Sequence, residues 1–191
     1  MKHIVRAAHI AALYFALTVL LAPISYGVVQ FRISEALCIL PLLMPEAAIG
    51  VAIGCLCANV YGGNPLDIIV GTACTAVSCL IQLVIRKYVK KDVAKIILGV
   101  LPHIIINSVF VPMVILGAEE LKTAYIAAML SVALGEAVVL CVLGVPLYFA
   151  VKKLSLGIVH TDSDDDYDKK YFLHKTLLNF LTKHRQFYIL I

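Results

Sequence analysis

The sequence predicts an all-α fold, a polytopic membrane helix bundle of about six transmembrane helices, and three observations indicate it. Hydrophobic residues make up 62% of the 191 residues and charged residues 15%, whereas soluble globular chains have about 45–50% and about 25%. The mean hydropathy is +0.97. Charge-free stretches of 18 to 25 residues recur along the chain, and roughly 20 apolar residues cross a bilayer core as a helix. An ordinary soluble domain is therefore excluded.

Five stretches are long enough to span a membrane, and one shorter stretch lies between the first two. The long ones are 7–31, 47–66, 68–85, 96–118 and 123–151. The first is too long for the 7–15-residue apolar core of a signal peptide, so we expect it to be retained.

The shorter stretch, 33–45, has 13 residues and is interrupted by Glu35, Pro41 and Pro45. As an α-helix at ~1.5 Å per residue it would cover only about 20 Å. We therefore expect a short, broken second helix that is joined tightly to the third.

Lys and Arg residues in short loops predict the orientation. They precede the first span (Lys2, Arg6), lie between the fourth and fifth (86–95) and follow the last (Lys152, Lys153). With six spans, all three groups lie on one face, which should be the cytoplasmic one. The sequence thus predicts a multi-pass protein of the cell membrane with cytoplasmic N- and C-termini.

The chain is predicted to divide into a membrane-embedded bundle, 1–154, and a cytoplasmic tail, 155–191. Within the tail, 161–170 is acidic and polar, which is typical of a disordered linker. Hydrophobic residues at helical spacing follow it. They fit either an amphipathic helix on the membrane surface or a poorly ordered tail.

Ionisable and amide side chains inside apolar spans are functional candidates, because a charge at the bilayer centre costs at least ~2.5–3.5 kcal/mol on insertion scales. Glu136 lies near the middle of the last span. It serves either a ligand or coupling role or an internal hydrogen bond. Asn107 lies four residues after His103 on the same helical face and is also a candidate, whereas His103 is expected to be a packed core residue.

Two further groups of polar residues lie nearer the predicted outer face. Arg32 and Glu35 are three residues apart, so they either join a site or form a solvated ion pair on one helix face. Asp67 either caps the fourth helix or faces an outer cavity together with Asn59.

We expect these side chains to form one substrate-binding site that is open to the outside. Its candidate residues are Glu35, Asn59, Asp67, Asn107, Glu136, Arg32, Tyr26 and Tyr61. Carboxylates and carboxamides accept hydrogen bonds, so the site suits a small donor-rich ligand such as a nucleobase edge, an amine or an amide. Tyr26, Tyr61 or Phe31 would stack on a flat ring.

Several catalytic motifs are missing from the sequence. It contains no G-x-x-x-x-G-K-[ST], H-E-x-x-H or G-x-S-x-G, so the chain does not hydrolyse ATP by the usual route. We predict no enzyme, no catalytic or metal-binding residue and no cofactor. The six cysteines lie in apolar runs and are interpreted as small buried residues. If the chain transports a ligand, the energy must come from an ion gradient or a partner.

Small residues recur at intervals of four in two spans, as Ala8, Ala12 and Ala16 and as Gly50 and Gly54. Such patterns let helices approach closely. They favour either docking of a partner or packing within the bundle.

Several segments of the sequence together resemble those of one known protein family. They are the alanine series of the first span and residues 22–37, 41–46, 54–59, 61–67, 135–136 and 143–147. In these segments, and over about residues 6–152, the chain resembles the QueT family, the substrate-binding S components of energy-coupling-factor (ECF) transporters that import queuosine precursors.

This resemblance implies a six-helix bundle that captures a deazaguanine from outside. It also implies docking on an ECF membrane scaffold subunit with two ABC ATPases, which the alanine series would meet, and toppling of the bundle in the lipid bilayer. No nucleic-acid partner is expected. Two alternatives stay open, a self-sufficient ion-coupled transporter of a small polar molecule and an S component for another vitamin-like ligand. A membrane enzyme or a structural subunit is disfavoured.

Overall fold

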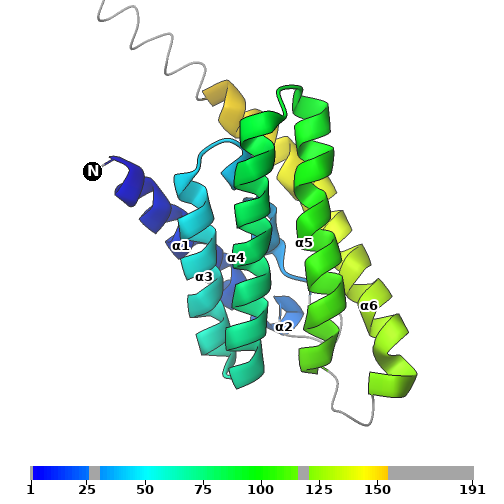
Figure 1. The fold of residues 1–191 in the computed structure, drawn as a ribbon. Coiled ribbons are helices and arrows are strands. Elements are labelled where there is room, and N and C mark those ends of the chain that lie inside the picture. Colours follow the sequence, from blue (N-terminus) through cyan, green and yellow to red (C-terminus); the bar gives the residue numbers. More distant parts are fainter. Residues whose placement is uncertain (1, 26–30, 116–120, 155–191) are drawn as a thin grey trace, which may run out of the picture. The chain divides into compact units, whose positions relative to one another are not determined.

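The computed structural model describes residues 2–25, 31–115 and 121–154, with side chains in those ranges except at 114–115 and 121–123. Within these residues every regular element is a helix and there is no strand, which confirms the all-α prediction (Figure 1). In order, the elements are α1 (Lys2–Leu20), α2 (Ala22–Ser25), the 3₁₀-helix η1 (Ile33–Leu42), α3 (Glu46–Gly62), α4 (Pro65–Tyr88), α5 (Asp92–Ile115), α6 (Leu121–Val138) and the π-helical turn η2 (Val139–Gly144). After η2 the chain continues as α-helix to Leu154.

Four of the described helical segments are long and apolar enough to cross a membrane. They are Lys2–Leu20, Pro65–Tyr88, Asp92–Met113 and Ala124–Leu154. The second and third predicted spans correspond to η1 and α3, which are shorter apolar helices of 10 and 17 residues. The described residues therefore include four apolar helices of spanning length and two apolar helices of 10–17 residues. This is consistent with a membrane helix bundle, and the count of six spans stays a prediction.

The short element η1 lies inside the bundle. Residues 34–42 are all buried, and η1 packs against α1, α3, α4, α5 and η2. The expected short second helix is confirmed, since η1 ends at Leu42 and α3 begins at Glu46. Because helices cover it, η1 can carry polar side chains without exposing them to lipid.

Close packing of α1 on α3 depends on the two glycines of α3. A Cβ atom at Gly50 would lie 2.5 Å from the carbonyl oxygen of Ala7, and one at Gly54 would lie 2.7 Å from the Cβ of Tyr14. Gly50 and Gly54 therefore pack the bundle internally, as the second of the two interpretations predicted.

The alanine series of α1 behaves differently. Ala8, Ala12 and Ala16 are all exposed, whereas the buried side chains of α1 are Ile10, Tyr14 and Thr18. One stripe of α1 thus faces the bundle, and the alanine stripe faces away from it.

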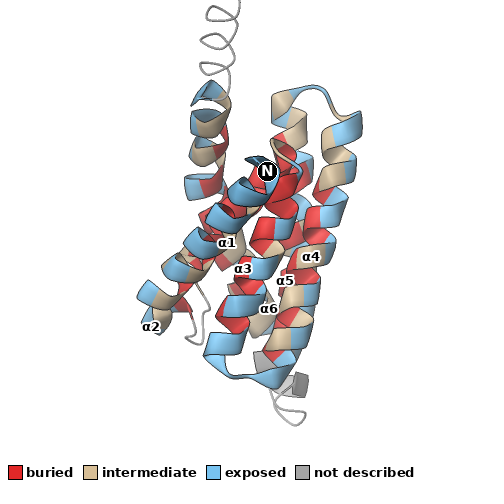
Figure 2. Ribbon diagram, turned by 90° about the vertical axis from the view of Figure 1, so that its left-hand side faces the viewer, coloured by how far each residue is buried: buried red, intermediate tan, exposed pale blue. Residues whose placement is uncertain are grey.

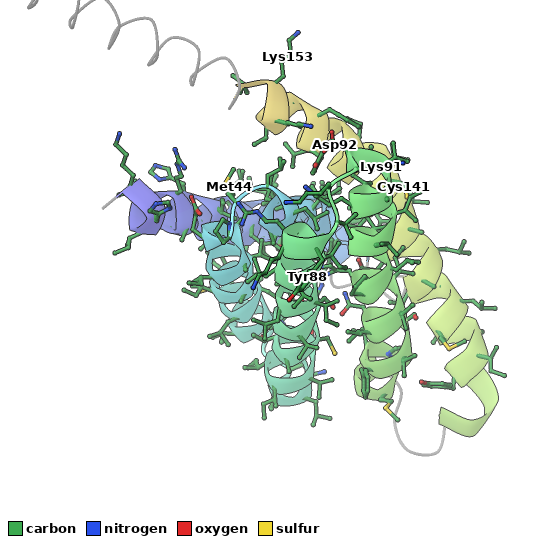
Figure 3. The ribbon with its side chains drawn as sticks, turned by 45° about the horizontal axis from the view of Figure 1, so that its top comes forward. Met44, Tyr88, Lys91, Asp92, Cys141 and Lys153 are labelled. Atoms are coloured by element: carbon green, nitrogen blue, oxygen red, sulfur yellow. The ribbon has the colours of Figure 1, made fainter. Side chains whose placement is uncertain are left out.

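The turn between α4 and α5 lies at the same end of the bundle as the N-terminus of α1 (Figures 1 and 2). Figure 3 shows Tyr88, Lys91 and Asp92 at this turn, and Met44 in the link between η1 and α3. Two hydrogen bonds hold this end together. Arg86 Nε donates to the carbonyl oxygen of Leu43 at 3.2 Å, and Tyr148 Oη donates to Asp92 at 2.9 Å. The basic residues of 2–6 and 86–95 thus gather at one end, as expected of a cytoplasmic face.

By its contacts the chain divides into Met1–Phe149 and Ala150–Ile191. Of the second unit, 150–154 are described and form a helix end. The predicted acidic linker and tail helix lie outside the described residues.

Candidate functional site

A small polar cavity lies among η1, α4, α5 and α6. Its volume is about 20 Å³, and its lining residues are Arg32, Glu35, Gly71, Thr75, Asn107, Val111, Val132 and Glu136. Four of the eight predicted substrate-binding residues are among them. They come from distant parts of the sequence, and the fold brings them to one place.

Arg32, which directly precedes η1, forms a buried polar network with α3 and α4. Its Nη2 lies 2.8 Å from Asp67 Oδ2, and its Nη1 donates to Asn59 Oδ1 at 2.9 Å. Asn59 Nδ2 in turn donates to the backbone carbonyl of Asp67 at 3.1 Å. We call Arg32, Asp67 and Asn59 the balanced cluster, because the guanidinium and the carboxylate neutralise each other. Predicted residues Asn59 and Asp67 therefore hold Arg32 and do not line the cavity themselves.

Two alternatives from the sequence are wrong for these residues. Arg32 and Glu35 do not form a solvated ion pair, since both are buried and the guanidinium pairs with Asp67. Nor does Asp67 cap α4. The N-cap is Asn64, whose side chain accepts a hydrogen bond from the backbone N–H of Leu66 at 3.1 Å.

Glu35 is buried on η1 and is held by neutral donors. Tyr14 Oη donates to Glu35 Oε1 at 2.5 Å, and Cys38 Sγ donates to Oε2 at 2.8 Å. Both carboxyl oxygens of Glu35 are therefore satisfied by hydrogen bonds from within the chain. Sequence reasoning missed both donors. Tyr14 could have been found from its place in the buried stripe of α1, in which residues recur at intervals of four. Cys38 could have been found from its position three residues after Glu35, because side chains at i and i+3 lie above one another in a 3₁₀-helix.

Asn107 of α5 and Glu136 of α6 form a pair across the two helices. Asn107 Nδ2 donates to Glu136 Oε1 at 2.7 Å. The remaining oxygens, Asn107 Oδ1 and Glu136 Oε2, are buried and have no hydrogen-bond partner among the described residues. An unsatisfied buried polar atom costs about 1–3 kcal/mol. The pair thus presents two acceptors that are suited to a ligand with hydrogen-bond donors.

We call Glu35, Asn107 and Glu136 the open cluster. Within the described residues, neither Glu35 nor Glu136 forms a salt bridge, so its two carboxylates have no counter-charge in contact. The cavity wall is therefore rich in carboxyl and amide oxygens that can accept hydrogen bonds.

His103 is fully buried, as expected of a packed residue, but it lies beside Glu35. One ring nitrogen of His103, one oxygen of Glu35 and the sulfur of Cys38 lie within 4.8 Å of one another. Both nitrogens lack a hydrogen-bond partner among the described residues. These three residues have the ligand types to accommodate a metal ion, although Glu35 already accepts hydrogen bonds from two neighbours.

The aromatic candidates are not brought into the cavity. Tyr61 is 59% exposed, and its ring packs edge-to-face on Phe15 with the centroids 6.2 Å apart. Phe31 does not line the cavity. Tyr26 lies outside the described residues.

The size of the cavity limits what it holds in this conformation. A volume of about 20 Å³ accommodates roughly one water molecule, whereas sites for small organic ligands have volumes of about 300–1,000 Å³. Binding of a flat heterocycle therefore requires the cavity walls to move apart.

Comparisons with known proteins point to one family. The family described as "QueT transporter" matches residues 4–153. The chain is also similar to the "Queuosine precursor transporter QueT" of Lactococcus lactis subsp. cremoris (strain MG1363), with 37% identity over 91 residues. That alignment covers 47% of this chain and 54% of the relative, so it spans about half the length of the curated protein. No solved structure matches the chain.

Proposed function

The chain belongs to the QueT transporter family, and from this premise we propose that it is the integral membrane substrate-binding component that takes up a queuosine precursor of the deazaguanine class. The observation that carries the proposal is the pair of unsatisfied acceptors in the open cluster. Asn107 Oδ1 and Glu136 Oε2 are buried without partners among the described residues, and both residues line one cavity.

A deazaguanine provides the complementary groups. Its pyrimidine edge carries a ring N–H and an exocyclic amino group side by side. A carboxylate that accepts a ring N–H makes a strong and directional hydrogen bond in a site without water. Glu136 would accept from the ring N–H, and Asn107 from the amino group. The ring carbonyl lies on the same edge, next to the ring N–H and on the other side of it from the amino group. The balanced cluster would hold Arg32 there, where the guanidinium can donate to this carbonyl.

The energy for uptake would come from partner subunits. We propose docking on an ECF scaffold subunit with two ABC ATPases, because the sequence has no phosphate-binding loop of its own. Ala8, Ala12 and Ala16 are exposed along α1 and would form the docking face, since small residues let another helix approach closely. The basic end of the bundle would face the cytoplasm. In this proposal 1–154 form the membrane bundle, in which η1 and α3 complete six membrane segments, and 155–191 form a cytoplasmic tail.

Ligand-induced stabilisation tests the proposal directly. The detergent-purified full chain would be heated with a panel of deazaguanines and, as controls, riboflavin, thiamine and biotin. A ligand that binds the folded state raises the unfolding temperature by mass action. We expect at least one deazaguanine to stabilise the protein and the vitamins to have no effect. Stabilisation by a vitamin alone would contradict the proposed ligand class. Uptake of deazaguanine into liposomes that contain only this chain would contradict the proposed dependence on ATPases.

A further inference from the structure

We propose that Glu35, Cys38 and His103 form a binding site for one zinc ion. The sequence predicted no metal-binding residue, because these three have no recognisable ligand spacing. The fold brings them together, since η1 carries Glu35 and Cys38 and α5 carries His103. Glu35 lines the polar cavity, whereas Cys38 and His103 do not. The inference therefore concerns a second site beside the cavity and does not depend on which organic ligand the cavity takes.

The ligand atoms of the three residues already lie near the spacing that a zinc ion requires. One oxygen of Glu35, the sulfur of Cys38 and one ring nitrogen of His103 lie within 4.8 Å of one another. Around a tetrahedral zinc ion, with Zn–S of about 2.3 Å and Zn–N or Zn–O of about 2.0–2.2 Å, neighbouring ligand atoms lie roughly 3.3–3.7 Å apart. Small side-chain rotations would therefore bring all three atoms onto one ion.

The imidazole of His103 is the observation that points to a ligand. This side chain is 0% exposed, and neither of its ring nitrogens has a hydrogen-bond partner among the described residues. A neutral imidazole has one N–H donor and one acceptor nitrogen, and a buried polar atom without a partner costs free energy. A metal ion bound to the acceptor nitrogen would remove that cost.

The two hydrogen bonds of Glu35 are compatible with metal binding. Tyr14 Oη donates to Glu35 Oε1 at 2.5 Å, and carboxylates that bind metals are usually held by such a second contact. Cys38 Sγ donates to Glu35 Oε2 at 2.8 Å. This second bond would be replaced, because a thiol loses its proton to water when its sulfur binds a metal ion. The sulfur and Oε2 would then be two adjacent anionic ligands.

The donor types and their charge favour zinc. A thiolate and a carboxylate carry two negative charges, so a divalent cation leaves the buried group neutral, and burial of a net charge is costly. The guanidinium of Arg32, which lines the same cavity as Glu35, is engaged by Asp67 at 2.8 Å. Calcium and magnesium prefer oxygen ligands, whereas a set of one sulfur, one nitrogen and one oxygen is typical of zinc. A water molecule would complete the four ligands.

Cobalt(II) is a spectroscopic probe for such a site, because it replaces zinc and its bond to a thiolate gives a charge-transfer band in the near ultraviolet. The detergent-purified full chain would be stripped with a chelator and titrated with cobalt chloride under nitrogen. We expect one equivalent of Co²⁺ to produce the thiolate band together with the visible bands of tetrahedral cobalt. We expect one equivalent of Zn²⁺ to abolish both.

Three variants assign the signal to the proposed ligands. Cys38→Ser should lose the thiolate band. Loss of a second contact around a metal ligand typically costs 10–100-fold in affinity, so we expect His103→Gln, which loses a ligand, to weaken Zn²⁺ binding at least about 100-fold in competition with a chromogenic chelator. Cys74→Ser is the matched control, because Cys74 is another buried free cysteine and lies outside the group. It should leave the band and the affinity unchanged.

Four outcomes would overturn the inference. The first is a wild-type protein without the thiolate band, a result that does not depend on any variant folding. The second is a band that is retained in Cys38→Ser, and the third is wild-type Zn²⁺ affinity in His103→Gln. The fourth is a band that is lost when the two exposed cysteines, Cys57 and Cys141, are both replaced by serine, which would indicate adventitious surface binding. None of these measurements uses a deazaguanine, so their failure would leave the proposed function standing.

Discussion

The balanced cluster and the open cluster are two buried polar groups that border the same cavity, and they differ in charge balance. In the balanced cluster the guanidinium of Arg32 meets the carboxylate of Asp67 at 2.8 Å, and Asn59 binds both residues. In the open cluster Glu35 and Glu136 have only neutral donors, from Tyr14, Cys38 and Asn107. A cluster whose carboxylate has a cationic partner within the chain is suited to a structural role, and one whose carboxyl groups contact neutral donors alone is suited to a ligand. Four variants test this distinction.

The largest effect is expected when the balanced cluster loses its cation. Replacing Arg32 by Met would leave Asp67 buried without a counter-charge. Breaking a buried pair from one side typically costs about 3–5 kcal/mol, so we expect a loss of this size in the free energy of unfolding. Denaturant titration in detergent would measure it. The double variant Arg32→Met with Asp67→Leu removes both charges and should recover most of the loss. A cost below about 1 kcal/mol for Arg32→Met would contradict a structural role.

A smaller loss is expected when the balanced cluster is crowded. A Cβ atom at Gly71 would lie 2.7 Å from Asp67 Oδ1 and 3.1 Å from Asn59 Nδ2. Overpacking of a tight interior usually costs about 1–3 kcal/mol, and we expect Gly71→Ala to lose stability in this range. Gly63→Ala would be a poor control because Gly63 has a φ of 77°. Gly144→Ala is a better one, since a Cβ atom there would lie 3.5 Å from its nearest neighbour, the carbonyl oxygen of Ala36, which is an ordinary contact distance. Unchanged stability of Gly71→Ala would mean that Asp67 moves freely.

The third variant sharpens the contrast because it should affect binding and not stability. Glu136→Gln keeps the shape of the side chain but removes the negative charge and one acceptor. We expect it to weaken deazaguanine binding more than tenfold, about 1.4 kcal/mol. We expect stability to be unchanged, since glutamine has the same shape and its amide oxygen can still accept the hydrogen bond from Asn107. Calorimetry and thermal unfolding would measure the two quantities. Wild-type affinity in the purified variant would remove Glu136 from the site.

The smallest effect on ligand binding is expected outside both clusters. Ala12 is exposed on α1, so Ala12→Leu should change ligand affinity less than twofold. It should nevertheless block docking, because a larger side chain prevents close approach of another helix. Co-purification with co-expressed scaffold and ATPase subunits would measure docking. Lys2→Ala, near the end of the same helix, is a matched exposed control. A variant that still co-purifies would refute the assignment of this face.

The sequence located most of the polar residues of the site, because each is unusual within its own span. Glu136 and Asn107 stand out in long apolar stretches, and the structure places both on the cavity together with Arg32 and Glu35. The sequence did not reveal their partners. Tyr14, Cys38 and His103 were not selected, although all three lie near Glu35, because a tyrosine, a cysteine or a histidine is not exceptional in a membrane helix.

The sequence by itself determined the class of fold, the short second helix and the list of costly side chains. These properties are local, since the free energy of inserting a segment into a membrane is set by that segment's own composition. Only the tertiary structure decided that Arg32 pairs with Asp67 rather than with Glu35, and that Tyr61 lies outside the cavity. The physical reason is that a membrane helix is apolar on its lipid-facing side as well as on its buried side. Hydrophobic periodicity therefore does not reveal which residues face inward, and only packing against the neighbouring helices does.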